Sequence, residues 1–167
     1  MISYFYNIYF GESNTNFTKT AFEKLPLPTL GAEEEKLMID FCYVIIDLIK
    51  GFNEIKHKFQ KFICEKFQFT KLSNKLKNWH ELEFGDFINE LNKGIKNLNK
   101  ERVKGSLKEI EPLTKKDEFE WLDLFEENKK KAQGLQSQIN QTDKEIDAMV
   151  YELYGLTDDE IKIVENS

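Results

Sequence analysis

Two stretches of the chain repeat mainly apolar residues at alternating intervals of three and four, a spacing that keeps one side of a helix facing a partner. The first seam starts after an abrupt change of pattern at Gly31 and comprises Met38, Phe41, Ile45, Leu48, Phe52, Ile55, Phe59 and Phe62. The second seam comprises Trp121, Phe125, Asn128, Ala132, Leu135, Ile139, Thr142, Ile146, Met149 and Leu153. These seams predict two long helices, at about 32–66 and about 116–154.

Two seams of similar length, about fifty residues apart, most economically pair with each other as an antiparallel hairpin. The residues between them have shorter helical faces, first Leu72, Leu76 and Trp79 and then Phe84, Phe87, Ile88, Leu91, Ile95 and Leu98. Gly105 and Pro112 interrupt this pattern. We therefore predict a mainly α protein, with two long antiparallel coiled-coil helices and a small helical cap, at about 69–113, at their tip.

The two ends of the chain have different signals. Gly155 predicts the end of the second long helix, and Thr157 begins a short helix at about 157–165 with Glu160 as its capping-box partner. At the other end, the prolines of Leu25–Pro28 require an extended backbone. The residues before them allow two interpretations: Tyr4, Phe5, Ile8 and Tyr9 suit a short helix, and Phe17–Phe22 suit a strand remnant.

The sequence IDAMVYELYGLTDDEI at Ile146–Ile161 closely resembles the C-terminal end of type IIG restriction enzymes that are also DNA methyltransferases. Phe17–Leu30 resembles the exit from the target-recognition domain of those proteins, and Leu72–Lys93 and Phe119–Gln133 resemble segments of their helical tail. From Phe17 onward, the chain thus resembles the TaqI-like C-terminal specificity domain of these restriction-modification enzymes, which is related to type I specificity subunits.

This resemblance implies that residues 1–30 are a remnant of a target-recognition region and that 31–167 form one helical domain. In intact relatives the recognition region reads DNA bases, and the paired helices set its geometry relative to a methyltransferase or a second recognition domain. The implied function is a non-catalytic helical spacer or assembly element for DNA target recognition, whose partners are a methyltransferase or restriction subunit and, through that complex, DNA. The alternative is a free-standing coiled-coil assembly protein that pairs with a methyltransferase subunit or forms a homodimer.

The charge distribution modifies this picture. The net charge of −6 argues against a simple basic DNA-binding module. Between Lys56 and Lys108, however, 13 Lys and Arg residues stand against 6 Asp and Glu, whereas the rest of the chain has 11 against 24. We expect any direct contact with DNA to be weak and made to the phosphate backbone by the cap. The candidate residues are Lys71, Lys75, Lys77, Lys93 and Lys96. Alternatively, these lysines only keep the surface of the cap hydrated, or they face the acidic segments on either side of residues 56–108 in another copy of the chain.

Candidate catalytic chemistry is sparse. The glycine-rich cofactor loop and the Asn-Pro-Pro-Tyr motif that an adenine methyltransferase needs do not occur. Glu160 and Lys162 match half of a metal-dependent nuclease centre, but Glu160 already has its capping role. His57 and His80 have no partner at zinc-ligand spacing. We expect no enzymatic activity, cofactor or metal; His57 should lie at the surface, His80 in the packing of the cap, and Lys129–Lys131 on a solvated helix face.

The cysteines and the apolar runs bear on location. Cys42 and Cys64 lie 22 residues apart on the first predicted helix, about 33 Å, which is too far for a disulfide. We expect buried or half-buried thiols in a cytoplasmic protein. The run Phe41–Ile46 is too short to span a membrane, and Ile2–Phe10 lacks the flanks of a signal peptide. A membrane partner is not expected.

Overall fold

A computed structural model of the chain describes residues 28–166, and all the regular structure of these residues is helical. The two long helices are α3 (Ala32–Phe67) and α6 (Lys115–Tyr154). The described residues divide into two compact units, a larger one of Tyr43–Thr142 and a smaller one of 28–42 and 143–166. The helix and strand interpretations of residues 4–22 lie outside the described residues.

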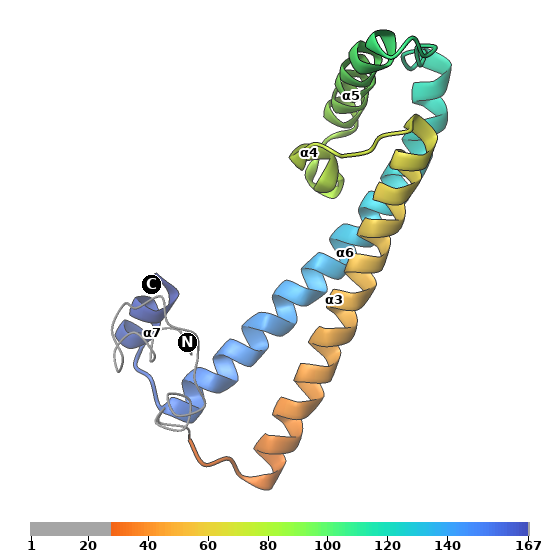
Figure 1. The fold of residues 1–167 in the computed structure, drawn as a ribbon. Coiled ribbons are helices and arrows are strands. Elements are labelled where there is room, and N and C mark those ends of the chain that lie inside the picture. Colours follow the sequence, from red (N-terminus) through yellow and green to blue (C-terminus); the bar gives the residue numbers. More distant parts are fainter. Residues whose placement is uncertain (1–27, 167) are drawn as a thin grey trace. The chain divides into compact units, whose positions relative to one another are not determined.

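In the larger unit, α3 and α6 run side by side in opposite directions, the yellow part of α3 beside the cyan part of α6 (Figure 1). Gly51 lies close to Leu135, whereas further along α3 the ring of Phe59 contacts the rings of Trp121 and Phe125, which come earlier in α6. Contacts that advance along one helix while they retreat along the other define an antiparallel pair. The predicted mainly α class with two long packed helices is therefore confirmed.

The core of the larger unit is a cluster of aromatic rings at the end where the cap packs on the hairpin. It includes Phe59 of α3, Trp79 of the cap, and Trp121 and Phe125 of α6, together with Phe87, all at most 5% exposed. The centroids of Phe59 and Trp79 are 4.1 Å apart, and those of Phe87 and Phe125 are 4.6 Å apart with the rings stacked. Buried rings of this size stabilise a domain more than any other side chains, so the cap and the hairpin tip fold as one body.

Agreement with the predicted seams is close but incomplete. Every position of the second seam is buried or half-buried, and so is the first seam from Met38 to Phe59. Phe62 was predicted in the first seam and is 43% exposed, whereas Ile63 is fully buried. The ring of Phe62 still contacts that of Trp121 of α6, at a centroid distance of 5.5 Å. Cap residues such as Trp79 and Phe87, as well as α6, pack against this part of α3. Its buried side therefore follows the helix's own period through Phe59, Ile63 and Phe67.

The cap contains α4 (Asn74–Lys77), the 3-10 helix η1 (Trp79–Glu81) and α5 (Phe84–Lys104). Ser73 caps α4, since its hydroxyl accepts a hydrogen bond from the Leu76 N–H at 3.2 Å. Three hydrogen bonds attach this region to α3: the Gln60 amide donates to the Lys77 carbonyl at 2.7 Å, Lys56 Nζ donates to Asn78 Oδ1 at 2.8 Å, and Trp79 Nε1 donates to the Lys56 carbonyl at 3.4 Å. These polar contacts fix the orientation of the cap around its apolar core.

The helix ends follow the capping signals of the sequence. After α6, Gly155 has a φ of 61°, and its N–H donates to Glu152 O while the Leu156 N–H donates to Tyr151 O, both at 3.0 Å. This pair of bonds is the Schellman motif, in which glycine adopts the left-handed backbone without strain. α7 (Asp158–Glu165) then begins with the predicted capping box between Thr157 and Glu160. Gly155 as the stop and Thr157 as the next start are confirmed.

The smaller unit contains the ends of both long helices and α7. Met38 and Phe41 of α3 and Ile146, Met149 and Leu153 of α6 are half-buried there. Cys42 is exposed, which corrects the expectation of a buried or half-buried thiol, whereas Cys64 in the larger unit is half-buried; both are free. Cys42 follows Phe41 and therefore lies off the seam. Within residues 28–166, no helix combines the length and the apolar character that crossing a membrane requires.

Candidate nucleic-acid interface

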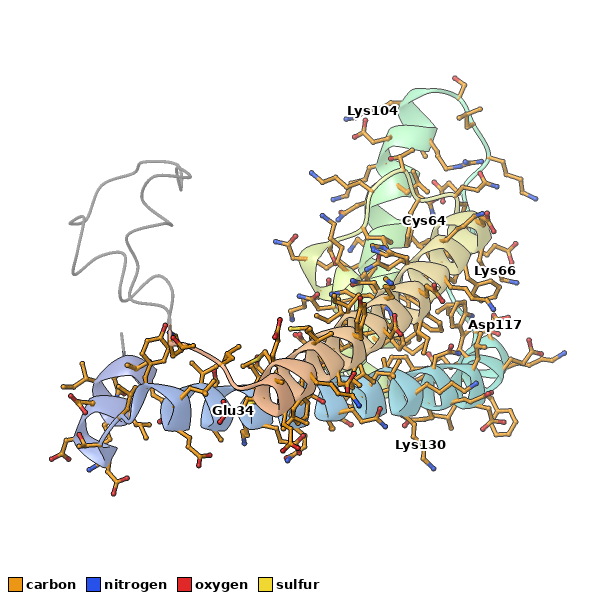
Figure 2. The ribbon with its side chains drawn as sticks, turned by 90° about the horizontal axis from the view of Figure 1, so that it is seen from below. Glu34, Cys64, Lys66, Lys104, Asp117 and Lys130 are labelled. Carbon is orange, nitrogen blue, oxygen red and sulfur yellow. The ribbon has the colours of Figure 1, made fainter. Side chains whose placement is uncertain are left out.

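Lysines gather on one side of α5. Lys96, Lys100 and Lys104 follow at intervals of four residues, so they lie on one side of the helix. They line a groove of about 830 Å³, which we call the α5 groove, together with Asn99 and Pro112. Figure 2 shows Lys104 at the far end of α5. Two carboxylates, Glu101 and Glu109, also line this groove, and Glu101 forms an ion pair with Lys104 at 3.0 Å. The groove is thus only weakly basic.

The wall opposite α5 is the segment after Gly105, and side chains of α5 hold it in place. Asn99 Nδ2 donates to the Ile110 carbonyl at 2.7 Å, and the Ile110 N–H donates to Asn99 Oδ1 at 2.9 Å. The Leu113 N–H donates to Asn92 Oδ1 at 3.2 Å, and Arg102 Nε donates to the Lys108 carbonyl at 2.6 Å. A segment without regular structure thereby has its backbone groups satisfied, and the shape of the groove is fixed.

A second groove, of about 300 Å³, lies between α5 and the segment that leads into α4, and we call it the α4 groove. Lys71, Ser73 and Lys93 are among its lining residues. At its centre the Glu90 side chain is only 11% exposed, with Lys93 Nζ at 3.5 Å and Lys75 Nζ at 3.9 Å. Ser73 Oγ also donates to Glu90 at 3.1 Å. A buried carboxylate requires such partners, so Lys75 and Lys93 have a structural role in addition to any external one.

The five lysines proposed from the sequence are therefore not one site. Lys71, Lys75 and Lys93 meet at the α4 groove, and Lys96 belongs to the α5 groove. Lys77 is exposed at the end of α4, where its carbonyl accepts the hydrogen bond from Gln60. Lys100 and Lys104 were not among the candidates, although their four-residue spacing from Lys96 was a usable signal. DNA contact by these residues stays a prediction.

Lys129 departs from the solvated face predicted for Lys129–Lys131. Lys129 is only 8% exposed, and its Nζ lies 2.9 Å from Glu83 Oε1 and 5.7 Å from the centre of the Phe125 ring. The long methylene stem covers the aromatic core while the amine reaches the exposed Glu83 carboxylate. Lys130 is exposed as expected and extends away from α6 in Figure 2. Lys129 thus contributes to the packing between α6 and the start of α5.

His80 is buried in the cap, as predicted, and His57 is exposed. The His80 ring makes edge contacts with Phe52 and Trp79, at centroid distances of 5.1 and 5.8 Å. Its Nδ1 has no hydrogen-bond partner. Burial lowers the pKa of His80, and the positive charge of Lys56 lowers it further, while Glu81 has a weaker opposite effect. His80 is therefore held neutral as part of the core.

The suspected nuclease residues Glu160 and Lys162 both lie in α7. Among residues 28–166, no group of three or more His, Cys, Asp or Glu side chains is placed to hold a metal ion. Glu160 accepts hydrogen bonds from the Thr157 N–H and hydroxyl at 2.8 and 2.7 Å, and these bonds lower the pKa of its carboxyl group. Lys162 pairs with Asp159 at 3.0 Å. Both members of the suspected nuclease pair are thus engaged within α7.

Comparison with protein families adds one finding. A family model described as domain of unknown function DUF8810 matches residues 31–150, which is 120 of the 167 residues. The chain belongs to this family. The DUF8810 match begins at the residue before α3 and ends inside α6, so it includes the whole larger unit with its core and both grooves. No curated protein and no solved structure matches the chain.

Proposed function

We propose that the chain is a non-catalytic helical spacer and assembly element of a restriction-modification DNA-specificity region. The observation that carries the proposal is the pairing of α3 and α6 in the larger unit, over residues 43–67 and 115–142, which at 1.5 Å per residue are about 37 and 42 Å long. Paired helices of this length, packed at one end around an aromatic core, suit a spacer. The resemblance of Ile146–Ile161 and Leu72–Lys93 to the tail of type IIG enzymes supplies the context.

The cap is the part of this element that we expect to touch DNA, through its backbone phosphates. Lys71, Lys96 and Lys100 support this assignment, because they are exposed and none forms an ion pair with another described residue. Amines that point into solvent bind phosphate without reading bases, so the contact is weak and indifferent to sequence. Sequence recognition belongs to the partner complex.

The assembly role is tested by co-purification from the native locus. A tagged chain should recover a methyltransferase or restriction polypeptide, identified by mass spectrometry, at a defined stoichiometry by light scattering. Incubated alone with a methyl donor, Mg²⁺ and duplex DNA, the chain should leave the DNA unmodified and uncut. Recovery of the chain without a DNA-modifying polypeptide, or DNA cleavage that is lost in Glu160→Ala, would contradict the proposal.

The cap contact is tested by titrating salt against duplex binding. A variant with Lys71, Lys96 and Lys100 changed to Glu should bind more weakly at low salt, and the slope of log affinity against log salt should become shallower by about one per lysine lost. The matched control carries three glutamates at Lys130, Lys144 and Lys36, exposed lysines outside the cap. Equal losses in both variants would show that net charge alone, rather than the cap, determines the binding.

The alternative function is a free-standing assembly protein that pairs with itself. It is favoured by the apolar residues that α3 leaves exposed, among them Tyr43 and Ile46. Sedimentation of the purified chain over a range of concentrations separates the two functions. A monomer that gains mass only with a methyltransferase polypeptide supports the spacer, whereas a concentration-dependent dimer supports self-assembly.

A further inference from the structure

One side of α5 is polar along its whole length. At about 100° per residue, seven residues of the helix fall within an arc of about 100° on this side, and all of them are exposed. They are Asp86, Asn89, Lys93, Lys96, Asn97, Lys100 and Lys104. We call these seven residues the α5 ridge. Phe87, Leu91 and Ile95, which are buried in the core, lie on the opposite side of the helix.

The α5 ridge separates the two grooves of the cap. Lys93 and Asn97 line the α4 groove, whereas Lys96, Lys100 and Lys104 line the α5 groove. The lysines that the grooves divide therefore belong to one row on the ridge. From the first lysine to the last, this row is about 16 Å long at 1.5 Å per residue.

Carboxylates reduce the positive charge at the two ends of the row. Near one end, the buried Glu90 pairs with Lys93 at 3.5 Å. At the other end, Glu101 pairs with Lys104 at 3.0 Å, and both side chains of this pair are exposed. Water screens an exposed ion pair and leaves it weak, so the charge of Lys104 is only partly offset.

The centre of the row keeps its positive charge. Lys96 and Lys100 form no ion pair with another described residue. Asp86, the acidic residue of the ridge, is about 15 Å from Lys96 along the helix axis. Glu109 lines the α5 groove beside these lysines and is their other acidic neighbour. The ridge thus presents a row of amines whose middle is its most positive part.

The side chains of the ridge indicate which negatively charged partner fits. Protein docking surfaces have apolar residues at their centre, and the ridge contains none. Single-stranded nucleic acid is held by aromatic rings on which its bases stack, and the ridge contains no aromatic residue. A straight row of amines on a rigid helix instead matches the phosphates of a duplex. At 3.4 Å per nucleotide of one strand, the row spans about five phosphates.

We propose that the α5 ridge is a docking surface for the phosphate backbone of double-stranded DNA. This inference rests on the proposed cap contact, and it specifies the surface and the form of the DNA. Lys96 and Lys100 bind phosphates at the centre of the contact, and Lys93 and Lys104 extend it along the helix. Asn97, between the central lysines, adds an amide that donates to phosphate oxygens, as neutral polar side chains commonly do.

The first test changes the charge of the ridge and leaves every lysine in place, so that the pair of Lys93 with Glu90 is kept. Asn89 and Asn97 are changed together, to Glu in one variant and to Lys in another. By fluorescence anisotropy at low salt with a duplex of about 20 base pairs, the Glu variant should bind at least about tenfold more weakly, and the Lys variant at least about threefold more tightly.

The matched controls have the same substitutions at Asn53 and Gln138, which are exposed residues of α3 and α6. Because they alter the net charge equally but lie outside the cap, they should change the affinity by less than about threefold. Circular dichroism checks that all variants keep their helix content. Equal changes of affinity in the ridge and control variants overturn the inference.

The second test identifies the form of the partner. The unmodified chain is titrated with the duplex, with one of its single strands and with polyglutamate of matched charge, and the duplex should bind at least about fivefold more tightly than either. Equal or tighter binding of the single strand or of polyglutamate overturns the inference, and so does a duplex that fails to bind at low salt. If co-purification of a DNA-modifying polypeptide succeeds while the duplex fails, the assembly function stands without the ridge.

Discussion

The ring of Phe69 lies directly against the backbone of Gly94, where a β-carbon would come within 2.8 Å of Phe69 Cζ. Gly94 is in the middle of α5, a position where glycine costs about 1 kcal/mol relative to alanine. Its absent side chain lets the segment after α3 approach α5 closely. Phe69 in turn stacks beside Phe67 at a centroid distance of 5.6 Å, so this approach connects α5 to the end of α3.

Gly94→Ala should therefore destabilise the protein, although alanine favours helix. The added methyl group has to displace the Phe69 ring, and overpacking of this kind costs about 1–3 kcal/mol. Urea unfolding followed by circular dichroism gives the free energy of unfolding. The double variant Gly94→Ala with Phe69→Leu should recover part of the loss, because the smaller side chain leaves space for the methyl group.

Two other helical glycines should respond in the opposite sense. A β-carbon at Gly51 would meet Leu135 Cδ1 at 3.6 Å, an ordinary van der Waals distance, and one at Gly134 would meet no atom within 4 Å. Gly51→Ala and Gly134→Ala should each stabilise the protein by about 0.5–1 kcal/mol, the difference in helix propensity. Thermal unfolding at one protein concentration measures this. A loss of stability in Gly51→Ala would mean that α3 and α6 lie closer together than this spacing.

Stability should depend much more on the cap end of the hairpin than on its remaining length. Phe125 is fully buried against Phe87 and the other core rings, so Phe125→Ala should cost about 3–5 kcal/mol. Ile139 belongs to the same seam but is half-buried, and Ile139→Ala should cost clearly less. Chemical unfolding of the two variants makes the comparison. Similar losses would show that the seam, rather than the aromatic cluster, dominates the stability.

The helices were predictable because periodicity and capping are local properties. Alternation of three and four residues from Met38 to Phe59 specifies a helix with one buried side, and Thr157 with Glu160 specifies a helix start. Neither depends on a distant residue. Phe62 contacts Trp121 of α6 but is more exposed than the seam predicts, because Trp79 and Phe87 of the cap also pack on this part of α3 and their approach is a tertiary event.

The same distinction applies to the candidate site. The excess of Lys and Arg in the cap can be counted from the sequence and was therefore predictable. The distribution of these lysines over two grooves depends on how α5 packs. Glu90 attracts Lys75 and Lys93 only because folding buries its carboxylate. Lys129 likewise differs from Lys130 solely through the position of Phe125 and Glu83. A run of like residues in the sequence does not show which member turns inward.

Stability should fall on mild acidification, and His80 should be the cause. Burial lowers the pKa of His80 in the folded protein below its ordinary value of 6.5. Above pH 6.5 the His80 side chain is neutral in both the folded and the unfolded protein, so its contribution to stability is fully present. As the pH falls below 6.5, His80 of the unfolded chain takes up a proton that the folded core resists, so the free energy of unfolding decreases. His80→Phe should flatten the pH dependence of the free energy of unfolding between about pH 7 and pH 5, as measured by urea unfolding over that range.

The hydrogen bonds between Asn99 and Ile110 should be required for the α5 groove. Asn99→Ala removes both bonds and leaves the half-buried N–H and carbonyl of Ile110 without partners, at an expected cost of about 1–3 kcal/mol. The Ile110 amide should then exchange its hydrogen faster by nuclear magnetic resonance, while that of Leu76 in α4, capped by Ser73, keeps its rate. Asn97→Ala is the control, since Asn97 is an exposed residue of the same helix. Unchanged exchange at Ile110 in Asn99→Ala would mean that the other contacts of the segment after Gly105, including its hydrogen bonds to Asn92 and Arg102, are enough to hold it.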